Sequence, residues 1–167
     1  MGFEWGSGRS TIWLGKRCSH VYSIEHDPRW HSAVSTMIER EGLASQVSYQ
    51  RIGVDLGEVA ELEGHPYVEA IATFPQNTFD WILVDGMIRL PCFRNALDKL
   101  KSGGLLILDN ANRYVPNAWN GSYSTVHEPR SIPRTAGWAE VLKRIEHWRA
   151  ILTTDGIWDT RFWQKPF

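Results

Sequence analysis

A cluster of small residues beside an acid lies at the start of the chain and could hold a ligand. Gly6 and Gly8 flank Ser7 directly after a short apolar run, and Glu4 comes just before them. Two glycines at this spacing allow a tight turn in which the backbone approaches a bound group closely. The pattern predicts a ligand-binding turn between a strand and a helix.

A second acid, Glu25, ends the next strand-like run 21 residues after Glu4. In a doubly wound fold, an acid at this place can accept hydrogen bonds from both hydroxyls of a ribose. The helix expected after the turn begins near Ser10 and Thr11, and the first N–H groups of a helix can receive an anion. Together these residues predict a site for a nucleoside-containing cofactor.

The residue types at positions 4 and 11 distinguish between cofactors. A dinucleotide fingerprint, G-x-G-x-x-G, needs glycine or alanine at position 11, where this chain has Thr11. The carboxylate of Glu4 would repel a pyrophosphate and attract an ammonium or a sulfonium. S-adenosylmethionine carries such a cation and is the cofactor expected, with a nicotinamide dinucleotide as the alternative.

Strand and helix patterns alternate along the chain that must position these residues. Continuously apolar or β-branched runs predict strands over residues 2–5, 20–25, 46–52, 79–86 and 104–110. Helical spacing and capping residues predict helices over residues 9–18, 26–42, 65–74, 89–104 and 137–148. Two strand-like runs, 149–154 and 159–165, are joined by a short turn typical of a hairpin. The fold class expected is α/β, a doubly wound, mostly parallel, Rossmann-like sheet with a C-terminal antiparallel hairpin.

Length and composition favour one globular domain over residues 1–167. The chain is 43% hydrophobic and 12% aromatic, with 18 basic and 19 acidic residues and a formal net charge of -1. No cluster of basic residues indicates a nucleic-acid or anionic-membrane partner, so we expect a small-molecule substrate. The spacing of Cys18 and Cys92 matches no metal or redox motif and suits reduced thiols in a cytoplasmic protein. Because a strand begins at residue 2, either the domain is minimal or upstream helices are missing.

Four short motifs, in this order, resemble those of the class I S-adenosylmethionine-dependent methyltransferases. They are FEWGSGRST, YSIEHDP, FDWILVDG and LKSGGLLILDN, and the resemblance covers about residues 2 to 112. It implies that Glu4, Gly6 and Gly8 line the methionine part of the cofactor, that Glu25 holds the ribose, and that His26 and Asp55 lie near the adenine. The complete expected cofactor site is Glu4, Gly6, Ser7, Gly8, Ser10, Thr11, Glu25, His26, Asp55 and Asp85.

A narrower resemblance, to the catechol-type O-methyltransferases, concerns the ends of the fourth and fifth strands. Those enzymes hold Mg²⁺ with an Asp after the fourth strand and an Asp-Asn pair after the fifth, where this chain has Asp85, Asp109 and Asn110. The resemblance implies that these three residues are catalytic and bind a metal ion, which would suit hard oxygen ligands. The family's catalytic lysine is replaced by Ile88. The alternative is that the three residues are ordinary strand-end acids and an Asn-driven turn.

A polar, aromatic-rich segment, residues 111–135, interrupts the strand and helix alternation, and loops of this length in compact domains are often functional. Arg113 and His127, within this segment, and Arg89, shortly after the fourth predicted strand, are further candidates for catalysis. Three aromatic residues of the segment could wall a substrate pocket or face a second copy of the chain in a homo-oligomer: Tyr114, Trp119 and Tyr123.

These features predict transfer of a methyl group from S-adenosylmethionine to an unidentified small-molecule acceptor. Such a transfer depends mainly on positioning, because a sulfonium methyl group reacts with any well-aligned nucleophile. Two alternatives use the same turn and the same ribose acid: an NAD(P)-dependent oxidoreductase, and a methyltransferase-like binding module without catalysis.

Overall fold

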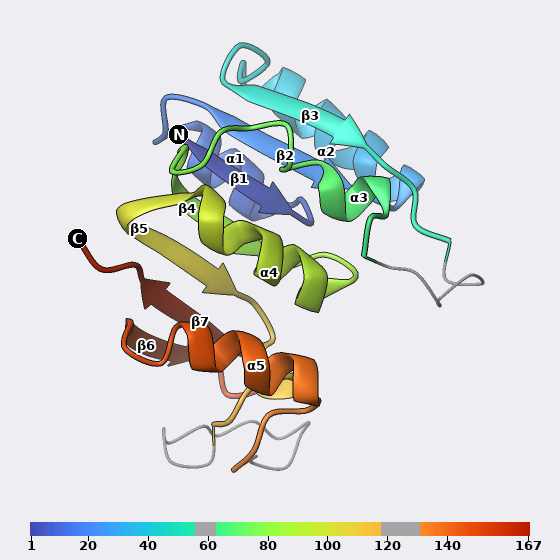
Figure 1. The fold of residues 1–167 in the computed structure, drawn as a ribbon. Coiled ribbons are helices and arrows are strands. Elements are labelled where there is room, and N and C mark those ends of the chain that lie inside the picture. The colour runs from blue at the N-terminus through green and yellow to red at the C-terminus, as the bar shows by residue number, and fades with distance from the viewer. Residues whose placement is uncertain (56–62, 118–130) are drawn as a thin grey trace.

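The computed structural model describes residues 1–55, 63–117 and 131–167, and it has the predicted alternation of strands and helices (Figure 1). The strands are β1 (Gly2–Trp5), β2 (Val21–Glu25), β3 (Val47–Arg51), β4 (Phe79–Val84), β5 (Leu100–Leu108), β6 (Arg149–Thr154) and β7 (Asp159–Gln164). The helices are α1 (Arg9–Gly15), α2 (Pro28–Arg40), α3 (Pro66–Glu69), α4 (Arg89–Lys99), α5 (Ala136–Arg144) and the 3₁₀ turn η2 (Ala111–Arg113).

Within the described residues, seven strands form one sheet in the order β3-β2-β1-β4-β5-β7-β6. The first five strands pair in parallel, whereas β7 runs antiparallel to both β5 and β6. The predicted doubly wound sheet with a C-terminal hairpin is confirmed. The chain winds outward from β1 to β3 and then returns to β4, so β1 and β4 flank the switch point at which such sheets bind ligands.

Side chains alternate along each strand between two cores, one on each face of the sheet. On β1, Phe3 and Trp5 point to the face covered by α3, α4 and α5 (Figure 1). Glu4 points to the opposite face, where α1 and α2 pack. The indole N–H of Trp5 donates to the carbonyl oxygen of Tyr67 at 2.7 Å, which fixes α3 against the first strand. Both faces are covered, as the continuously apolar strands require.

Four of the predicted helices extend too far, and of these the one expected over residues 137–148 ends at Arg144. The helix expected over residues 89–104 ends at Lys99, and residues 100–104 begin β5 because they pair with the start of β4 and with the chain after β7. Gly103, at φ 75°, lets the strand bend there. The helix expected over residues 65–74 is a single turn, after which the chain turns so that Phe74 packs edge-on against Phe79 at 5.0 Å. The helix expected over residues 9–18 ends at Gly15.

The structure describes residues 111–117 and 131–135 of the long segment 111–135, and the first of these ranges begins with η2. His127, Trp119 and Tyr123 lie outside the described residues. No helix in the described ranges is long and apolar enough to cross a membrane.

The turn after β1 is packed against the turn after β4, and only glycine fits there. Gly6 has φ 89°, and a Cβ atom on it would lie 2.7 Å from the backbone nitrogen of Gly86. Gly42 has φ 67° but no heavy atom within 4 Å of its Cβ position. Substitutions at Gly6 and Gly42 can therefore distinguish two losses of stability: that caused by the left-handed backbone conformation and that caused by the close contact.

We expect Gly6→Ala to destabilise the protein more than Gly42→Ala. The left-handed conformation alone costs about 1–2 kcal/mol with a side chain, which is the loss expected for Gly42→Ala. Gly6→Ala adds a clash with the backbone of a neighbouring strand end, so the loss should be clearly larger. Urea unfolding of both variants measures the difference, and equal losses would show that the two turns can move apart at no cost.

Candidate functional site

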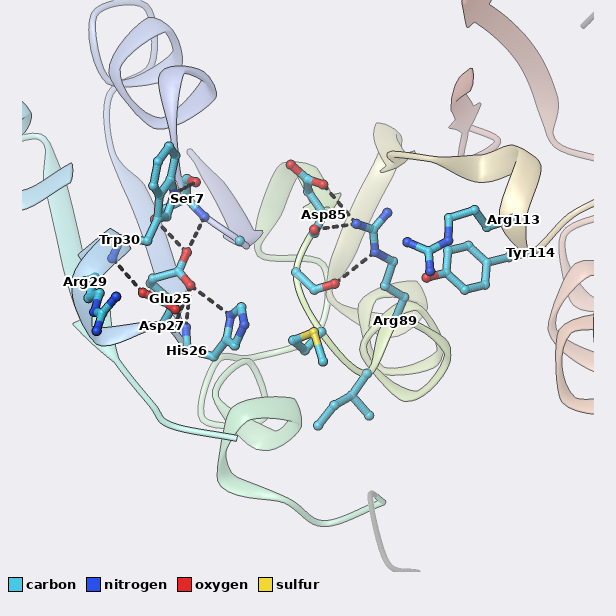
Figure 2. A pocket seen from close by; sticks show the side chains of 14 residues that line it. Ser7, Glu25, His26, Asp27, Arg29, Trp30, Asp85, Arg89, Arg113 and Tyr114 are labelled. Carbon is cyan, nitrogen blue, oxygen red and sulfur yellow. Dashed lines mark hydrogen bonds and ion pairs between the residues drawn. The ribbon is translucent and has the colours of Figure 1, made fainter. Parts of the chain in front are cut away.

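A cavity of about 760 Å³ opens at the carboxyl ends of β1, β2 and β4, at the switch point of the sheet (Figure 2). Fourteen residues line it: Gly6, Ser7, Glu25, His26, Asp27, Arg29, Trp30, Asp85, Gly86, Met87, Ile88, Arg89, Arg113 and Tyr114. Five of the residues predicted for the site are among them, namely Gly6, Ser7, Glu25, His26 and Asp85.

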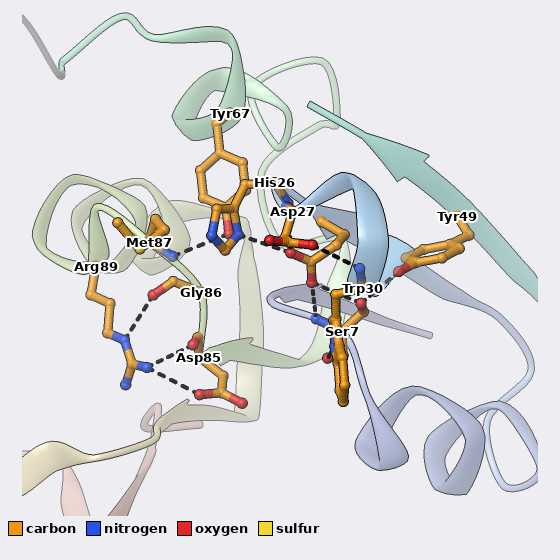
Figure 3. A network of polar contacts seen from close by, with 11 residues as sticks. Ser7, His26, Asp27, Trp30, Tyr49, Tyr67, Asp85, Gly86, Met87 and Arg89 are labelled. Carbon is orange, nitrogen blue, oxygen red and sulfur yellow. Dashed lines mark hydrogen bonds and ion pairs between the residues drawn. The ribbon is translucent and has the colours of Figure 1, made fainter. Parts of the chain in front are cut away.

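The Glu25 carboxylate joins the turn after β1 to the start of α2. Its Oε2 accepts hydrogen bonds from the backbone N–H of Ser7 at 3.0 Å and from the hydroxyl of Ser7 at 2.8 Å. Its Oε1 accepts from the backbone N–H groups of His26 and Asp27, and the His26 ring nitrogen Nδ1 lies 2.8 Å away (Figures 2 and 3). Only 2% of Glu25 is exposed, so these donors replace the water that a carboxylate needs. The acid is held in one orientation at the wall of the cavity.

Two aromatic residues flank the same turn. The indole N–H of Trp30 donates to the carbonyl oxygen of Ser7 at 2.5 Å, and 48% of the Trp30 residue remains exposed. The hydroxyl of Ser7 also lies 2.6 Å from the hydroxyl of Tyr49 (Figure 3). The sequence analysis did not predict Trp30 in the site. Its position in the first turn of a helix capped by Asp27, next to Glu25, was the available signal.

Glu4 does not line the cavity. Strand alternation turns its side chain to the face covered by α1, where it is fully buried and accepts hydrogen bonds from the hydroxyls of Ser10, Thr11 and Ser23. Burial raises the pKa of Glu4 to about 7, because the lost hydration outweighs the hydrogen bonds that favour the charged form. The expectation that Glu4 lies at the mouth of the turn is wrong, because its carboxylate lies beneath the turn.

The other residues predicted around the turn also lie outside the cavity wall. Thr11 accepts a hydrogen bond from the backbone N–H of Gly8 at 2.9 Å, so the first turn of α1 is capped by its own side chain. Ser10 faces Glu4 at 3.3 Å. Gly8 packs against Trp30: a Cβ atom added to Gly8 would lie 3.7 Å from the Trp30 ring. Asp55, after β3, does not line the cavity either.

Arg89, the first residue of α4, joins the ends of β4 and β5. Its guanidinium donates to the carbonyl oxygens of Asp85, Gly86 and Asp109, and also to the side-chain oxygens of Asp85 and Asn110, both at 3.1 Å. Only 9% of Arg89 is exposed. Ile88, just before it, is held at φ 51°, a left-handed conformation that is unusual for a β-branched residue. The buried contacts of Arg89 stabilise this entry into the helix.

The predicted metal ligands do not fit Mg²⁺ as they are arranged. Asp85 Oδ1 and Asn110 Oδ1 both accept from the Arg89 guanidinium, and Asp109 Oδ1 accepts from the Thr160 hydroxyl at 2.7 Å. A guanidinium therefore occupies the position expected for a metal ion. Asp109 and Asn110 line a separate cavity of about 290 Å³, and no group of three His, Cys, Asp or Glu residues in the described ranges is placed to hold a metal. The expectation of a magnesium site is not supported.

Asp85 remains at the wall of the main cavity. Burial, reinforced by the nearby Asp109 carboxylate, raises the pKa of Asp85 to about 7, although the Arg89 guanidinium opposes this shift. The corner thus holds a carboxylate whose pKa lies above its ordinary value, next to a buried cation. Arg89 and Arg113, candidates from the sequence, both line the cavity.

The buried carboxylate of Glu4 predicts a pH-dependent stability. The folded state keeps a proton on Glu4 up to about pH 7, whereas the unfolded chain releases it near pH 4.5. The contribution of Glu4 to the free energy of unfolding therefore falls as the pH rises through this window and stays low above it. Glu4→Gln removes this titration. From about pH 5 to about pH 8 the stability of the variant should rise relative to wild type by on the order of 3 kcal/mol.

Urea unfolding of both proteins at several pH values measures this change independently of any constant offset caused by the amide. A difference between the two proteins that stays flat across the window would mean that Glu4 is ionised in the folded protein at low pH.

Comparisons with known proteins give the family and the fold of the chain. A family model described as "Methyltransferase domain" matches residues 3–111. No curated protein matches the sequence. The solved structures that it resembles include an O-methyltransferase from Bacillus cereus in complex with S-adenosylhomocysteine, with TM-score 0.66, 21% identity and coverage of 98% of this chain and 72% of that chain.

Two further structures have the same fold. The O-methyltransferase TomG from Streptomyces achromogenes, in complex with S-adenosylmethionine, has TM-score 0.66 and 16% identity over 99% of this chain and 73% of that one. A methyltransferase from Geobacter sulfurreducens has TM-score 0.62 and 16% identity over 99% of this chain and 71% of that one. At these identities the structures establish the fold, while the family match, which covers well over half of the chain, establishes the family. The chain belongs to the methyltransferase domain family, as a class I S-adenosylmethionine-dependent methyltransferase.

Proposed function

We propose that residues 1–167 form one methyltransferase domain that moves a methyl group from S-adenosylmethionine to an oxygen atom of a small acceptor in the main cavity. The observation that carries this proposal is the oriented carboxylate of Glu25 beside the Gly6–Ser7 turn at the switch point of the sheet. Structures of the same fold that are described as O-methyltransferases support oxygen as the acceptor atom.

For Glu25 to bind the ribose, one of its present hydrogen-bond donors would have to be replaced by the ribose hydroxyls. A carboxylate offers about four acceptor positions, and Ser7, His26 and Asp27 already donate four hydrogen bonds to Glu25. The Ser7 hydroxyl is the donor that can leave most easily, because it keeps the Tyr49 hydroxyl at 2.6 Å as a partner. The ribose hydroxyls would take its place, with the Trp30 ring alongside.

The turn favours S-adenosylmethionine over a dinucleotide. Thr11 stands where a dinucleotide fingerprint has its third glycine, and its hydroxyl already accepts from the Gly8 N–H that a pyrophosphate would need. The carboxylate of Glu4 lies directly beneath and would repel a pyrophosphate whenever it is ionised. The same carboxylate would attract a sulfonium, which is positively charged.

In the proposed reaction the acceptor oxygen attacks the sulfonium methyl group as the bond from that carbon to sulfur breaks. The products are the methylated oxygen and S-adenosylhomocysteine. The acceptor hydroxyl releases its proton to the carboxylate of Asp85, which lines the cavity and is held by Arg89. The rest of the catalysis is alignment of the two reactants. The cation at this corner is the Arg89 guanidinium, so no divalent cation is needed.

Cofactor binding tests the proposal. We expect S-adenosylhomocysteine to bind wild-type protein in isothermal titration, and Glu25→Gln to weaken it about 10-fold or more, since hydrogen bonds to a charged acceptor are lost. Glu39→Gln is the matched control: it makes the same acid-to-amide change at an exposed residue of α2 that lies outside the cavity wall. It should leave the affinity nearly unchanged.

Three results would contradict the proposal. Tight binding of NAD without binding of S-adenosylhomocysteine would favour an oxidoreductase. Equal effects of the two substitutions would remove Glu25 as the ribose acid. Binding of S-adenosylhomocysteine without methylation of any acceptor in a broad panel of small hydroxyl compounds would favour a module that binds the cofactor without catalysis.

The position of Arg89 predicts that Mg²⁺ does not stabilise the protein. A ligand present at about 100 times its dissociation constant raises the free energy of unfolding by about 2.7 kcal/mol. We therefore expect millimolar Mg²⁺ to leave the thermal unfolding midpoint unchanged, with or without S-adenosylhomocysteine, and EDTA to have no effect on methyl transfer. A midpoint that rises with Mg²⁺ concentration and saturates would mean that Arg89 gives way to a metal ion.

A further inference from the structure

The two ends of the main cavity carry different side chains. Glu25, Asp27 and Arg29 lie at the end beside Trp30, whereas Arg113 and Tyr114 lie at the opposite end, beyond Arg89 (Figure 2). A cofactor held by Glu25 would leave the end next to Arg113 for the acceptor. The chemistry of that end therefore bears on the acceptor's identity.

Three guanidinium groups surround one aromatic ring at this end. The central carbons of Arg89, Arg113 and Arg134 lie 5.6, 5.7 and 5.9 Å from the ring centroid of Tyr114. Each contact with the ring is worth about 0.5–1 kcal/mol at an exposed site, which offsets only part of the repulsion between like charges. Tyr114 itself is fixed by packing against Trp138 at 5.3 Å.

Within the described part of the chain, Arg113 differs from Arg89 in having no anionic partner. Arg89 is paired with Asp85 at 3.1 Å. Among residues 1–55, 63–117 and 131–167, no hydrogen bond or ion pair involves the guanidinium of Arg113 or of Arg134. Of these two, only Arg113 lines the cavity. A guanidinium at a cavity wall whose five donors have no partner among the described residues suits the two oxygens of a carboxylate.

We propose that Arg113, fixed beside the ring of Tyr114, forms a carboxylate-binding subsite at the acceptor end of the cavity, and that the acceptor is a small carboxylic acid that also bears the hydroxyl to be methylated. Met87 and Ile88 line the adjoining wall and provide an apolar surface for the body of the acceptor. This inference rests on the proposed function, because it assumes that the cofactor occupies the end of the cavity at Glu25.

A carboxylate could reach Arg113 from two sources, since S-adenosylmethionine carries one on its methionine part. The two sources predict different variant phenotypes. Loss of Arg113 would weaken the binding of S-adenosylhomocysteine if the subsite held the cofactor, and it would weaken only the binding of a separate acid if the subsite held the acceptor.

The test uses the full chain saturated with S-adenosylhomocysteine, with benzoate as the probe and benzamide as its neutral counterpart. Binding of each probe is followed by ligand-observed NMR in wild type, Arg113→Gln, Arg113→Lys and Arg134→Gln. Arg134→Gln is the matched control, because Arg134 lies as close to Tyr114 but outside the cavity wall. Thermal unfolding of each variant checks that the fold is kept.

We expect benzoate to bind wild type and Arg134→Gln alike, and about 10- to 100-fold more weakly to Arg113→Gln, the range of a charge-assisted hydrogen-bonded pair. Arg113→Lys should keep part of the affinity, and S-adenosylhomocysteine should bind all four proteins equally. The inference would be overturned if benzoate bound wild type no better than benzamide does, or if it bound Arg113→Gln as well as wild type. It would also be overturned if Arg113→Gln lost affinity only for S-adenosylhomocysteine. Failure of wild type to bind S-adenosylhomocysteine would instead overturn the proposed function.

Discussion

The hydrogen-bonded carboxylate of Glu25 is the constraint on which the cavity depends. It is buried at the end of β2 and, together with the indole of Trp30, ties the turn after β1 to the start of α2. Because the protein's own donors fix its orientation, the cavity wall is formed before any ligand arrives. A site that is ordered in advance loses less conformational entropy on binding.

A second connection of the same kind closes the other side of the cavity. Arg89 joins the ends of β4 and β5 through three carbonyl oxygens and two side chains. An unpaired charge at 9% exposure would be costly, and these partners offset that cost. The two connections lie on either side of the switch point, one built on an acid and the other on a base.

The sequence predicted the architecture well because apolar periodicity and caps are local signals. The strand alternation, the Asp27 cap of α2 and the C-terminal hairpin are all visible in short windows. The boundary between α4 and β5 was missed because residues 100–104 are a strand only through pairing with distant segments. Helical propensity in that window carries no information about such partners.

The site was predicted less completely, for a related reason. Glu25 and the Gly6–Ser7 turn could be predicted because their places are set by strand ends. Glu4 was placed on the wrong side of the turn, although the period of two along β1 contained the answer: its neighbours Phe3 and Trp5 are core residues of the other face. The role of Arg89 could not be predicted, since its partners come from two strand ends that meet only in the folded sheet.

The pairing of β7 between β5 and β6 has a consequence for how the protein is made on the ribosome. Thr160, on β7, holds the Asp109 carboxylate at the end of β5, yet it is synthesised after every other element of the sheet. Segments nearer the N-terminus emerge first and can begin to fold before it. The end of the cavity at Glu25, built from β1 and β2, can therefore assemble early in translation. The edge beyond Asp109 must wait until β7 has emerged and inserted beside β5.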